Sequence, residues 1–229
     1  MKKKLIILGS TGSIGSTTIN IVLKNKNNFD VILLTANKNY VKLLIQAKKL
    51  NCRNIVIFNK ENFFKAKIMN KNKKIKIFNS IKEFLNNHKG KVDYTMCAIT
   101  GISGLMPIIQ ITRITKNLAI ANKESIICGW NLIEKEIVKY NVKFIPIDSE
   151  HFSIQSLIKN NKKVEIDTIY ITASGGPFLK LPISQFKNIS VEKAINHPNW
   201  KMGKKISVDS STLMNKVFEV IEAQRIFKL

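Results

Sequence analysis

Cysteine and long apolar runs are scarce in this chain of 229 residues, and each scarcity excludes a class of protein. The three cysteines, Cys52, Cys97 and Cys128, are odd in number and form no CxxC pair, so we expect reduced thiols rather than a disulfide framework. No apolar run reaches the ~18 residues that a membrane span needs. The run at 5–8 is too short for the core of a signal peptide. We therefore expect a cytoplasmic protein that begins at Met1 and has no membrane partner.

Acidic residues are also few, 15 against 38 lysines and arginines, which gives a net charge of +23. A charge of this size suggests nucleic-acid binding, but only Arg53, Arg113 and Arg225 are arginines, and arginine is the residue that reads bases best. The lysines form short scattered groups, and the abundance of Lys, Asn and Ile is typical of AT-rich coding bias. We interpret them as solvated surface lysines and predict no nucleic-acid partner. The alternative, a basic nucleic-acid-binding protein, predicts affinity that falls steeply with salt.

The pattern of apolar residues predicts the α/β class. Short apolar runs alternate with helical patterns through the first part of the chain, which predicts a Rossmann-like, doubly wound parallel sheet. After about residue 148 the chain is punctuated by glycine and proline, with a further strand over 166–172 and a helix over 211–226. We therefore expect two domains, 1–143 and 144–229, the second of α+β type. Strands are predicted at 5–8, 31–35, 54–58, 75–78, 92–99 and 118–121 in the first domain, and at 142–147 across the boundary.

A glycine loop follows the first predicted strand and opens the first predicted helix. Gly9, Gly12 and Gly15 are spaced as G-x-x-G-x-x-G, a variant of the dinucleotide-binding fingerprint. Glycines at this turn let backbone N–H groups approach a pyrophosphate at the positive end of the helix. The loop predicts a dinucleotide site, and a tight turn without a ligand is the alternative.

The end of the second predicted strand bears on the choice of dinucleotide. NAD sites place a carboxylate there to hold the ribose hydroxyls. Here the strand runs into Asn37, Lys38 and Asn39, with no acid and one cation. The lysine favours NADP, whose 2′-phosphate it would attract, and a solvated loop lysine is the alternative.

Two carboxylates follow the predicted strand at 142–147. Ligands of open α/β sheets collect at this end of a strand. Alternation along an extended segment would point Asp148 and Glu150 the same way, and two such carboxylates attract a hard divalent cation. The alternative is a solvated loop end.

A second polar cluster lies in the last predicted helix. Helical spacing places Asn215 and Glu219 on one face with Lys216 adjoining, a set that suits a phosphorylated polyol around a metal. The alternative is an amphipathic helix capped by Asp209 or Ser210, and both interpretations can hold together.

Two further segments carry candidate residues. His197 lies in a loop with proline and tryptophan, the kind of loop that closes over a substrate. Lys123, between Asn122 and Glu124, adds a cation just after a predicted strand.

Together these motifs resemble the 1-deoxy-D-xylulose 5-phosphate reductoisomerases, enzymes of non-mevalonate isoprenoid synthesis. Six motifs occur in the family's order and approximate spacing, which makes the resemblance specific. They are GSTGSIG at 9–15, ANKES at 121–125, DSEH at 148–151, SGGPF at 174–178, HPNWKMG at 197–203 and ISVDSSTLMNK at 206–216.

The resemblance implies a role for each candidate residue. NADPH would be bound by Thr11, Gly12, Ser13, Ile14, Asn37, Lys38, Asn39, Asn122, Glu124 and Gly203. Mg²⁺ or Mn²⁺ would be held by Asp148, Glu150 and Glu219. The sugar phosphate would be bound by Lys123, Ser149, Glu150, Ser174, His197, Ser210, Asn215, Lys216 and Glu219. Catalysis would depend on Lys123, Asp148, Glu150, His197 and Glu219, beneath a lid carrying Trp200 and Met202.

The implied reaction is an oxidoreductase and isomerase step: the sugar phosphate rearranges by retro-aldol and aldol chemistry, and hydride transfer then reduces the aldehyde to 2-C-methyl-D-erythritol 4-phosphate. The resemblance also implies that full-length relatives form homodimers, and that this chain, as a fragment or truncated form, lacks their C-terminal helical domain. The alternative function is an NADPH-binding module with impaired catalysis.

Overall fold

The computed structural model describes residues 1–71, 74–158, 166–196 and 203–228. Its contacts divide the chain into two compact units, Met1–Ile147 and Asp148–Leu229. In the part of the chain so described, no helix combines the length and the apolar character needed to cross a membrane.

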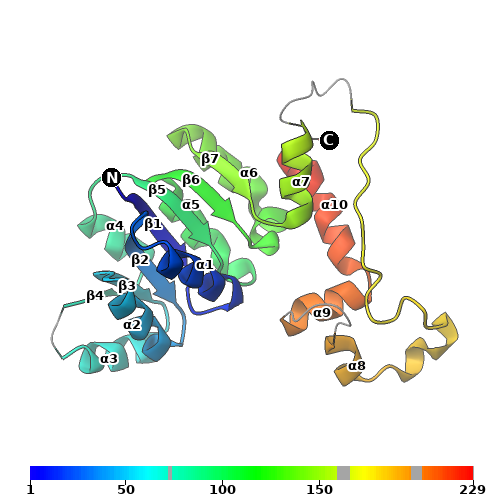
Figure 1. Cartoon of the computed structure of the whole chain (residues 1–229), viewed down its shortest axis with the longest axis horizontal. Coiled ribbons are helices and arrows are strands. Elements are labelled where there is room, and N and C mark those ends of the chain that lie inside the picture. The colour runs from blue at the N-terminus through cyan, green and yellow to red at the C-terminus, as the bar shows by residue number, and fades with distance from the viewer. Residues whose placement is uncertain (72–73, 159–165, 197–202, 229) are drawn as a thin grey trace. The chain divides into compact units, whose positions relative to one another are not determined.

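A parallel seven-stranded sheet forms the centre of the first unit (Figure 1), as the sequence predicts. The strand order is β4-β3-β2-β1-β5-β6-β7, so the chain builds outward from β1 in one direction and then in the other. The strands are β1 (Lys3–Leu8), β2 (Phe29–Ala36), β3 (Asn54–Ile57), β4 (Lys76–Phe78), β5 (Val92–Cys97), β6 (Thr115–Ile120) and β7 (Lys143–Pro146). The connecting helices are α1 (Ser13–Lys24), α2 (Tyr40–Lys49), α3 (Lys60–Met69), α4 (Ile81–Asn87), η1 (Ile102–Gly104), α5 (Leu105–Thr112) and α6 (Lys123–Tyr140).

Helices cover both faces of this sheet, which explains why its strands are continuous apolar runs. Leu5 and Ile7 of β1 belong to a core cluster with residues of α1, α2 and α3. Because side chains alternate along a strand, Ile6 and Leu8 face the opposite side, and both are fully buried there. The helical members of the cluster are Ile19, Val22, Leu43, Leu44, Ala47, Phe63 and Ala66.

The glycine loop lies at the topological switch point of the sheet, where the order of the strands reverses. β1 pairs with β2 on one side and with β5 on the other, and open α/β sheets bind ligands at such a switch point. Gly9 has a φ of +76°, and a Cβ there would lie 2.7 Å from the carbonyl oxygen of Ala98. A side chain at this position would therefore collide with the backbone that follows β5.

A buried polar network ties the glycine loop to β2 and α2. The Ser10 hydroxyl donates to Gln46 Oε1 at 2.8 Å, and Gln46 Nε2 donates back to the Ser10 carbonyl at 3.0 Å. The Ser10 N–H donates to the Thr35 carbonyl, and the Gly9 N–H donates to Thr35 Oγ1 at 2.8 Å. Thr35 and Gln46 thus satisfy the polar groups of the loop that face the protein interior.

The three cysteines are free, with Cys52 and Cys97 buried and Cys128 exposed. Burial raises the pKa of the Cys52 thiol to about 12 and raises that of Cys97 as well. Both thiols therefore remain protonated and pack as small apolar groups.

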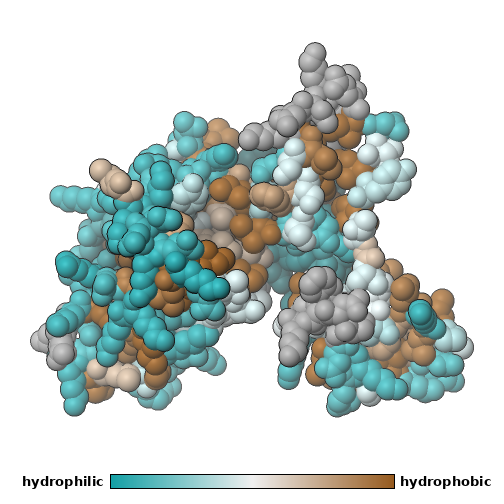
Figure 2. Space-filling view, viewed as in Figure 1, coloured by the Kyte–Doolittle hydropathy of each residue, from teal (hydrophilic) through white to brown (hydrophobic). Residues whose placement is uncertain are grey.

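Many hydrophilic residues lie on the surface of the first unit. On the face shown in Figure 2, hydrophilic side chains spread over this unit.

The regular elements among the described residues of the second unit are all helices, namely α7 (Ser149–Ile158), η3 (Ile183–Asn188), α8 (Val191–Ile195), α9 (Lys204–Ser211) and α10 (Met214–Phe227). Its small core joins Ile154 of α7 to Ala223 and Phe227 of α10, with Ile169 and Ile171 packed against it. The strand predicted over 166–172 is not formed, because this stretch has no neighbouring strand among the described residues to share backbone hydrogen bonds. Its isoleucines pack on the helices instead.

The helix predicted over 211–226 is interrupted at its start. Leu213 adopts the left-handed conformation with a φ of 60° and separates α9 from α10. Asp209 and Ser210 lie inside α9, so the alternative interpretation, in which one of them caps the last helix, is wrong. The non-helical backbone of Leu213 stands at that cap position, with no side-chain hydrogen bond.

Replacement of Thr35 by valine tests the network under the glycine loop. Thr35→Val keeps the side-chain shape but removes the acceptor of the Gly9 N–H, so the free energy of unfolding should fall by about 1–3 kcal/mol. Urea denaturation measures the change. Thr112→Val is the matched control, because its hydroxyl donates to the Ile108 carbonyl, which keeps its helical N–H partner. An equal loss in the two variants would contradict a special role for Thr35.

Candidate functional site

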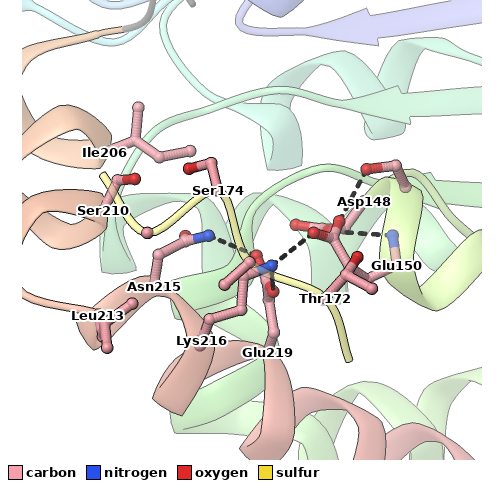
Figure 3. A pocket seen from close by; sticks show the side chains of 13 residues that line it. Asp148, Glu150, Thr172, Ser174, Ile206, Ser210, Leu213, Asn215, Lys216 and Glu219 are labelled. Atoms are coloured by element: carbon pink, nitrogen blue, oxygen red, sulfur yellow. Dashed lines mark hydrogen bonds and ion pairs between the residues drawn. The ribbon is translucent and has the colours of Figure 1, made fainter. Parts of the chain in front are cut away.

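One pocket of the second unit collects most of the polar residues that the sequence singled out there (Figure 3). Its volume is about 520 Å³, and its walls come from α7, the segment 172–175, α9 and α10. The candidate residues brought together are Asp148, Ser149, Glu150, Ser174, Ser210, Asn215, Lys216 and Glu219. Thr172, Ile206 and Leu213 line the same pocket but were not predicted as site residues, because nothing in their residue type or spacing sets them apart from other loop and helix residues.

Three carboxylates meet in this pocket. One oxygen from each of Asp148, Glu150 and Glu219 lies within 4.8 Å of the other two. The expected cause, alternation along an extended segment, is wrong. The Phe152 N–H donates to the Asp148 carbonyl and α7 begins at Ser149, so a helical first turn brings Asp148 and Glu150 together. An all-oxygen set of this kind suits Mg²⁺ or Mn²⁺.

Lys216 compensates two of these carboxylates. Its ammonium donates to Glu150 Oε1 at 2.6 Å and also to Glu219. The Asn215 amide donates to the other oxygen of Glu219, as the predicted helical spacing requires. Glu219 is 2% exposed, so its charge depends on these donors.

The three ionisable groups have displaced pKa values. Burial alone would raise the pKa of Glu150, but hydrogen bonds with Asp148, Lys216 and Ser149 outweigh it and lower that pKa to about 2. Burial and the neighbouring carboxylates raise the pKa of Glu219, against the effect of Lys216. Burial works against the charge of Lys216 too, but Glu150 and Glu219 raise its pKa. The pocket therefore favours one well-stabilised carboxylate beside one that is costly to ionise.

Gly176 brings the SGGPF segment against α9. Its φ is +66°, and a Cβ there would lie 2.6 Å from the carbonyl oxygen of Ser210. Only glycine permits this approach, which places Ser174 and Ser210 in the wall of one pocket. The two hydroxyls can donate to the oxygens of an anionic ligand.

His151 is a further polar residue at this site that the sequence interpretation did not single out. It is fully buried, and its Nε2–H donates to the Glu219 carbonyl at 2.9 Å. Its Nδ1 lies 3.8 Å from both Asp148 Oδ1 and Glu222 Oε2. His151 thus joins α7 to α10, the two helices that supply the acidic groups. The only available signal was its place in the DSEH motif, since its hydrogen-bond partner, the Glu219 carbonyl, is 68 residues away.

The first unit contains a second candidate site at the glycine loop. Gly12 is the N-cap of α1 and no side chain caps the helix, which leaves its first turn able to accept an anion. Thr11, Ser13 and Ile14 accompany it, and Asn37 and Lys38 lie exposed after β2. Asn39 caps α2, accepting from the Lys42 N–H at 3.1 Å.

The remaining predicted residues lie outside the lining of the acidic pocket or outside the described residues. Asn122 caps α6, accepting from the Ser125 N–H at 2.7 Å and donating to the carbonyls of Ile99 and Gly101. Lys123 is buried and Glu124 lies in the same first helical turn. Gly203 is the N-cap of α9, outside the pocket lining. His197, Trp200 and Met202 lie outside the described residues.

The opposite pKa shifts of the two glutamates predict opposite effects on stability. A lowered folded-state pKa adds stability above the ordinary value, and Glu150 should lose that contribution as the pH falls toward about 2. A raised pKa makes the Glu219 carboxylate a cost at neutral pH, and this cost should disappear as the pH falls. At pH 7 without divalent ions, Glu150→Gln should lower the melting temperature by about 2 °C or more and Glu219→Gln should raise it by a similar amount. Calorimetry measures both, and shifts of the same sign would contradict the assignment.

Two sequence profiles match the chain. Residues 5–129 match that of 1-deoxy-D-xylulose 5-phosphate reductoisomerase, and residues 144–227 match that of the 1-deoxy-D-xylulose 5-phosphate reductoisomerase C-terminal domain.

Curated relatives and solved structures agree with these profiles. The chain is 54% identical over 230 residues to the 1-deoxy-D-xylulose 5-phosphate reductoisomerase of Pelagibacter ubique (strain HTCC1062), and the match covers 99% of this chain and 59% of the relative. It resembles the Zymomonas mobilis enzyme in complex with NADPH, with a TM-score of 0.89, 32% identity, and coverage of 100% of this chain and 59% of that one. A DOX-P reductoisomerase in complex with NADPH, fosmidomycin and magnesium gives a TM-score of 0.86 and 34% identity, with coverage of 99% and 59%. This chain thus spans about three fifths of their length, and it belongs to the 1-deoxy-D-xylulose 5-phosphate reductoisomerase family.

Proposed function

We propose that this chain carries the NADPH site and the metal and sugar-phosphate site of a reductoisomerase that converts 1-deoxy-D-xylulose 5-phosphate into 2-C-methyl-D-erythritol 4-phosphate. The observation that carries the proposal is the pocket in which three carboxylates meet Lys216, Asn215 and two serine hydroxyls. In this proposal residues 1–143 bind the cofactor, and residues 144–229 bind the metal and the substrate.

The acidic cluster is the proposed metal site. Asp148, Glu150 and Glu219 offer hard oxygen ligands close enough together for one divalent cation. When bound, Mg²⁺ or Mn²⁺ polarises the carbonyl and hydroxyl oxygens of the substrate. The contact from His151 to the Glu219 carbonyl keeps α10 beside α7, so the ligands from both helices stay in register.

The opposite wall of the pocket is the proposed phosphate and hydroxyl site. Ser174 and Ser210 can donate to phosphate oxygens, while Asn215 and Lys216 provide an amide and a cation beside the acidic cluster. Binding energy gained at the phosphate would position the reacting carbons relative to the carboxylates. Ser149, Lys123 and His197 remain candidates for the same substrate from the family resemblance.

The glycine loop is the proposed cofactor site. The first turn of α1 supplies backbone N–H groups to the pyrophosphate, and the acid-free end of β2 accommodates a 2′-phosphate. NADPH itself supplies the hydride. In the family, Asn122, Glu124 and Gly203 would complete this site.

A cytoplasmic location is part of the proposal, whereas a homodimer is proposed only for full-length relatives and not for this chain alone. Free cysteines are compatible with a reducing compartment. Sedimentation velocity of the chain would measure its oligomeric state.

NADPH oxidation that needs both Mn²⁺ and 1-deoxy-D-xylulose 5-phosphate tests the proposed activity. Asp148→Asn should lower kcat/KM by about 10²-fold or more, because it removes one metal ligand. Glu192→Gln is the matched control, since Glu192 lies in the first turn of α8 and outside the pocket lining, and it should change the rate by less than about twofold.

The result also separates the proposal from its alternative. Absence of turnover with intact NADPH binding would contradict the catalytic proposal and favour an NADPH-binding module. Turnover that is unaffected by Asp148→Asn would contradict the assignment of the metal site.

A further inference from the structure

A lysine of α2, outside the glycine loop and the segment 37–39, contacts the glycine loop. Lys42, in the first turn of α2, donates from Nζ to the Thr11 carbonyl at 2.9 Å and to the Ser16 hydroxyl at 2.8 Å. Both partners belong to the glycine loop and the helix that it opens. The Lys42 residue is nevertheless exposed, so a ligand on the loop can reach its ammonium.

The position of Lys42 is fixed by the polar contacts around it. Its backbone N–H is held by the Asn39 side chain at the start of α2. One turn later on the same helix face, Gln46 is buried and exchanges two hydrogen bonds with Ser10 of the loop. Lys42 and Gln46 therefore both hold α2 against the loop. The buried hydrogen bonds between Gln46 and Ser10 fix the helix, and this fixes the exposed contacts of Lys42.

The chemistry of the ammonium leaves one donor for a ligand. A lysine ammonium has three N–H donors, and two of those on Lys42 are used by Thr11 and Ser16. The third has no acceptor among the described residues and can donate to an anion bound beside the loop. Lys38, in contrast, donates no hydrogen bond and forms no ion pair through its ammonium within the described ranges, so its position is not fixed in the same way.

The location of Lys42 indicates which anion it serves. In dinucleotide sites the segment that follows the second strand faces the adenosine ribose, where NAD enzymes place a carboxylate. Here that segment contains Asn37, Lys38 and Asn39, and Lys42 follows within one helical turn. A fixed cation in place of a carboxylate favours a phosphorylated ribose.

We infer that Lys42 binds the 2′-phosphate of NADPH and is the main residue that makes this chain prefer NADPH to NADH. The inference rests on the proposed function and deepens its cofactor site. It assigns to Lys42 the selectivity that the sequence pattern attributes to Lys38, with Gln46 and Ser10 as positioning residues that keep α2 against the loop.

Direct titration of NADPH and NADH, followed by cofactor fluorescence at one fixed ionic strength, tests the inference without turnover. Lys42→Met should raise the Kd for NADPH by about 10- to 100-fold, the range expected for losing a hydrogen bond to a charged group. The Kd for NADH should change by less than about twofold. Lys42→Arg should keep most of the preference because the charge remains. Lys49→Met, in the last turn of the same helix, is the matched control and should leave both affinities unchanged.

The outcomes separate this inference from the proposed function. A wild-type chain that binds neither nucleotide would refute the proposed function, and this inference with it. Equal losses for NADPH and NADH in Lys42→Met would overturn the inference alone and make Lys42 a clamp of the loop or a pyrophosphate ligand. An unchanged NADPH Kd would overturn it as well, as would a larger loss of NADPH preference in Lys38→Met. Should Lys42→Met fail to fold, Lys42→Gln, which keeps N–H donors without the charge, decides by the same ratio of affinities.

Discussion

The second unit depends on the compensation of negative charge that its pocket concentrates. The carboxylates of Asp148, just before α7, and of Glu150, on α7, lie close to that of Glu219 on α10, which is nearly inaccessible to solvent. Without donors such a group costs several kcal/mol, so the Lys216 ammonium and the Asn215 amide are structural requirements as well as candidate ligand contacts. The left-handed turn at Leu213 makes this possible, because it ends α9 and starts α10 one residue before Asn215.

The sheet and the glycine loop could be predicted because their causes are local. Strand-length apolar runs follow from burial on both faces, and Gly9 is required by backbone contact at a single turn. The acidic pair at 148 and 150 was predicted for the wrong geometric reason, since the segment is helical from Ser149 onward. The sequence pattern therefore identified the two acidic residues but not the helical backbone that brings them together.

Long-range contacts explain what the sequence could not provide. Lys42 and Gln46 form their contacts with the glycine loop only when α2 packs against it. His151 reaches the Glu219 carbonyl only when α10 lies beside α7. Residues 166–172 have the composition of a strand, but strand formation needs a neighbour, and within the described ranges none is present. Composition reports the propensity of a segment and says nothing about its partners.

The contact between α7 and α10 has a thermodynamic consequence. These two helices supply the carboxylates of the pocket and also the apolar residues of the unit's small core, Ile154, Ala223 and Phe227. A cation that draws the carboxylates together therefore acts on the same helix pair that the core holds. Ligand affinity and the cooperativity of unfolding become linked quantities in this half of the chain, whereas the large sheet of the other half has an independent source of stability.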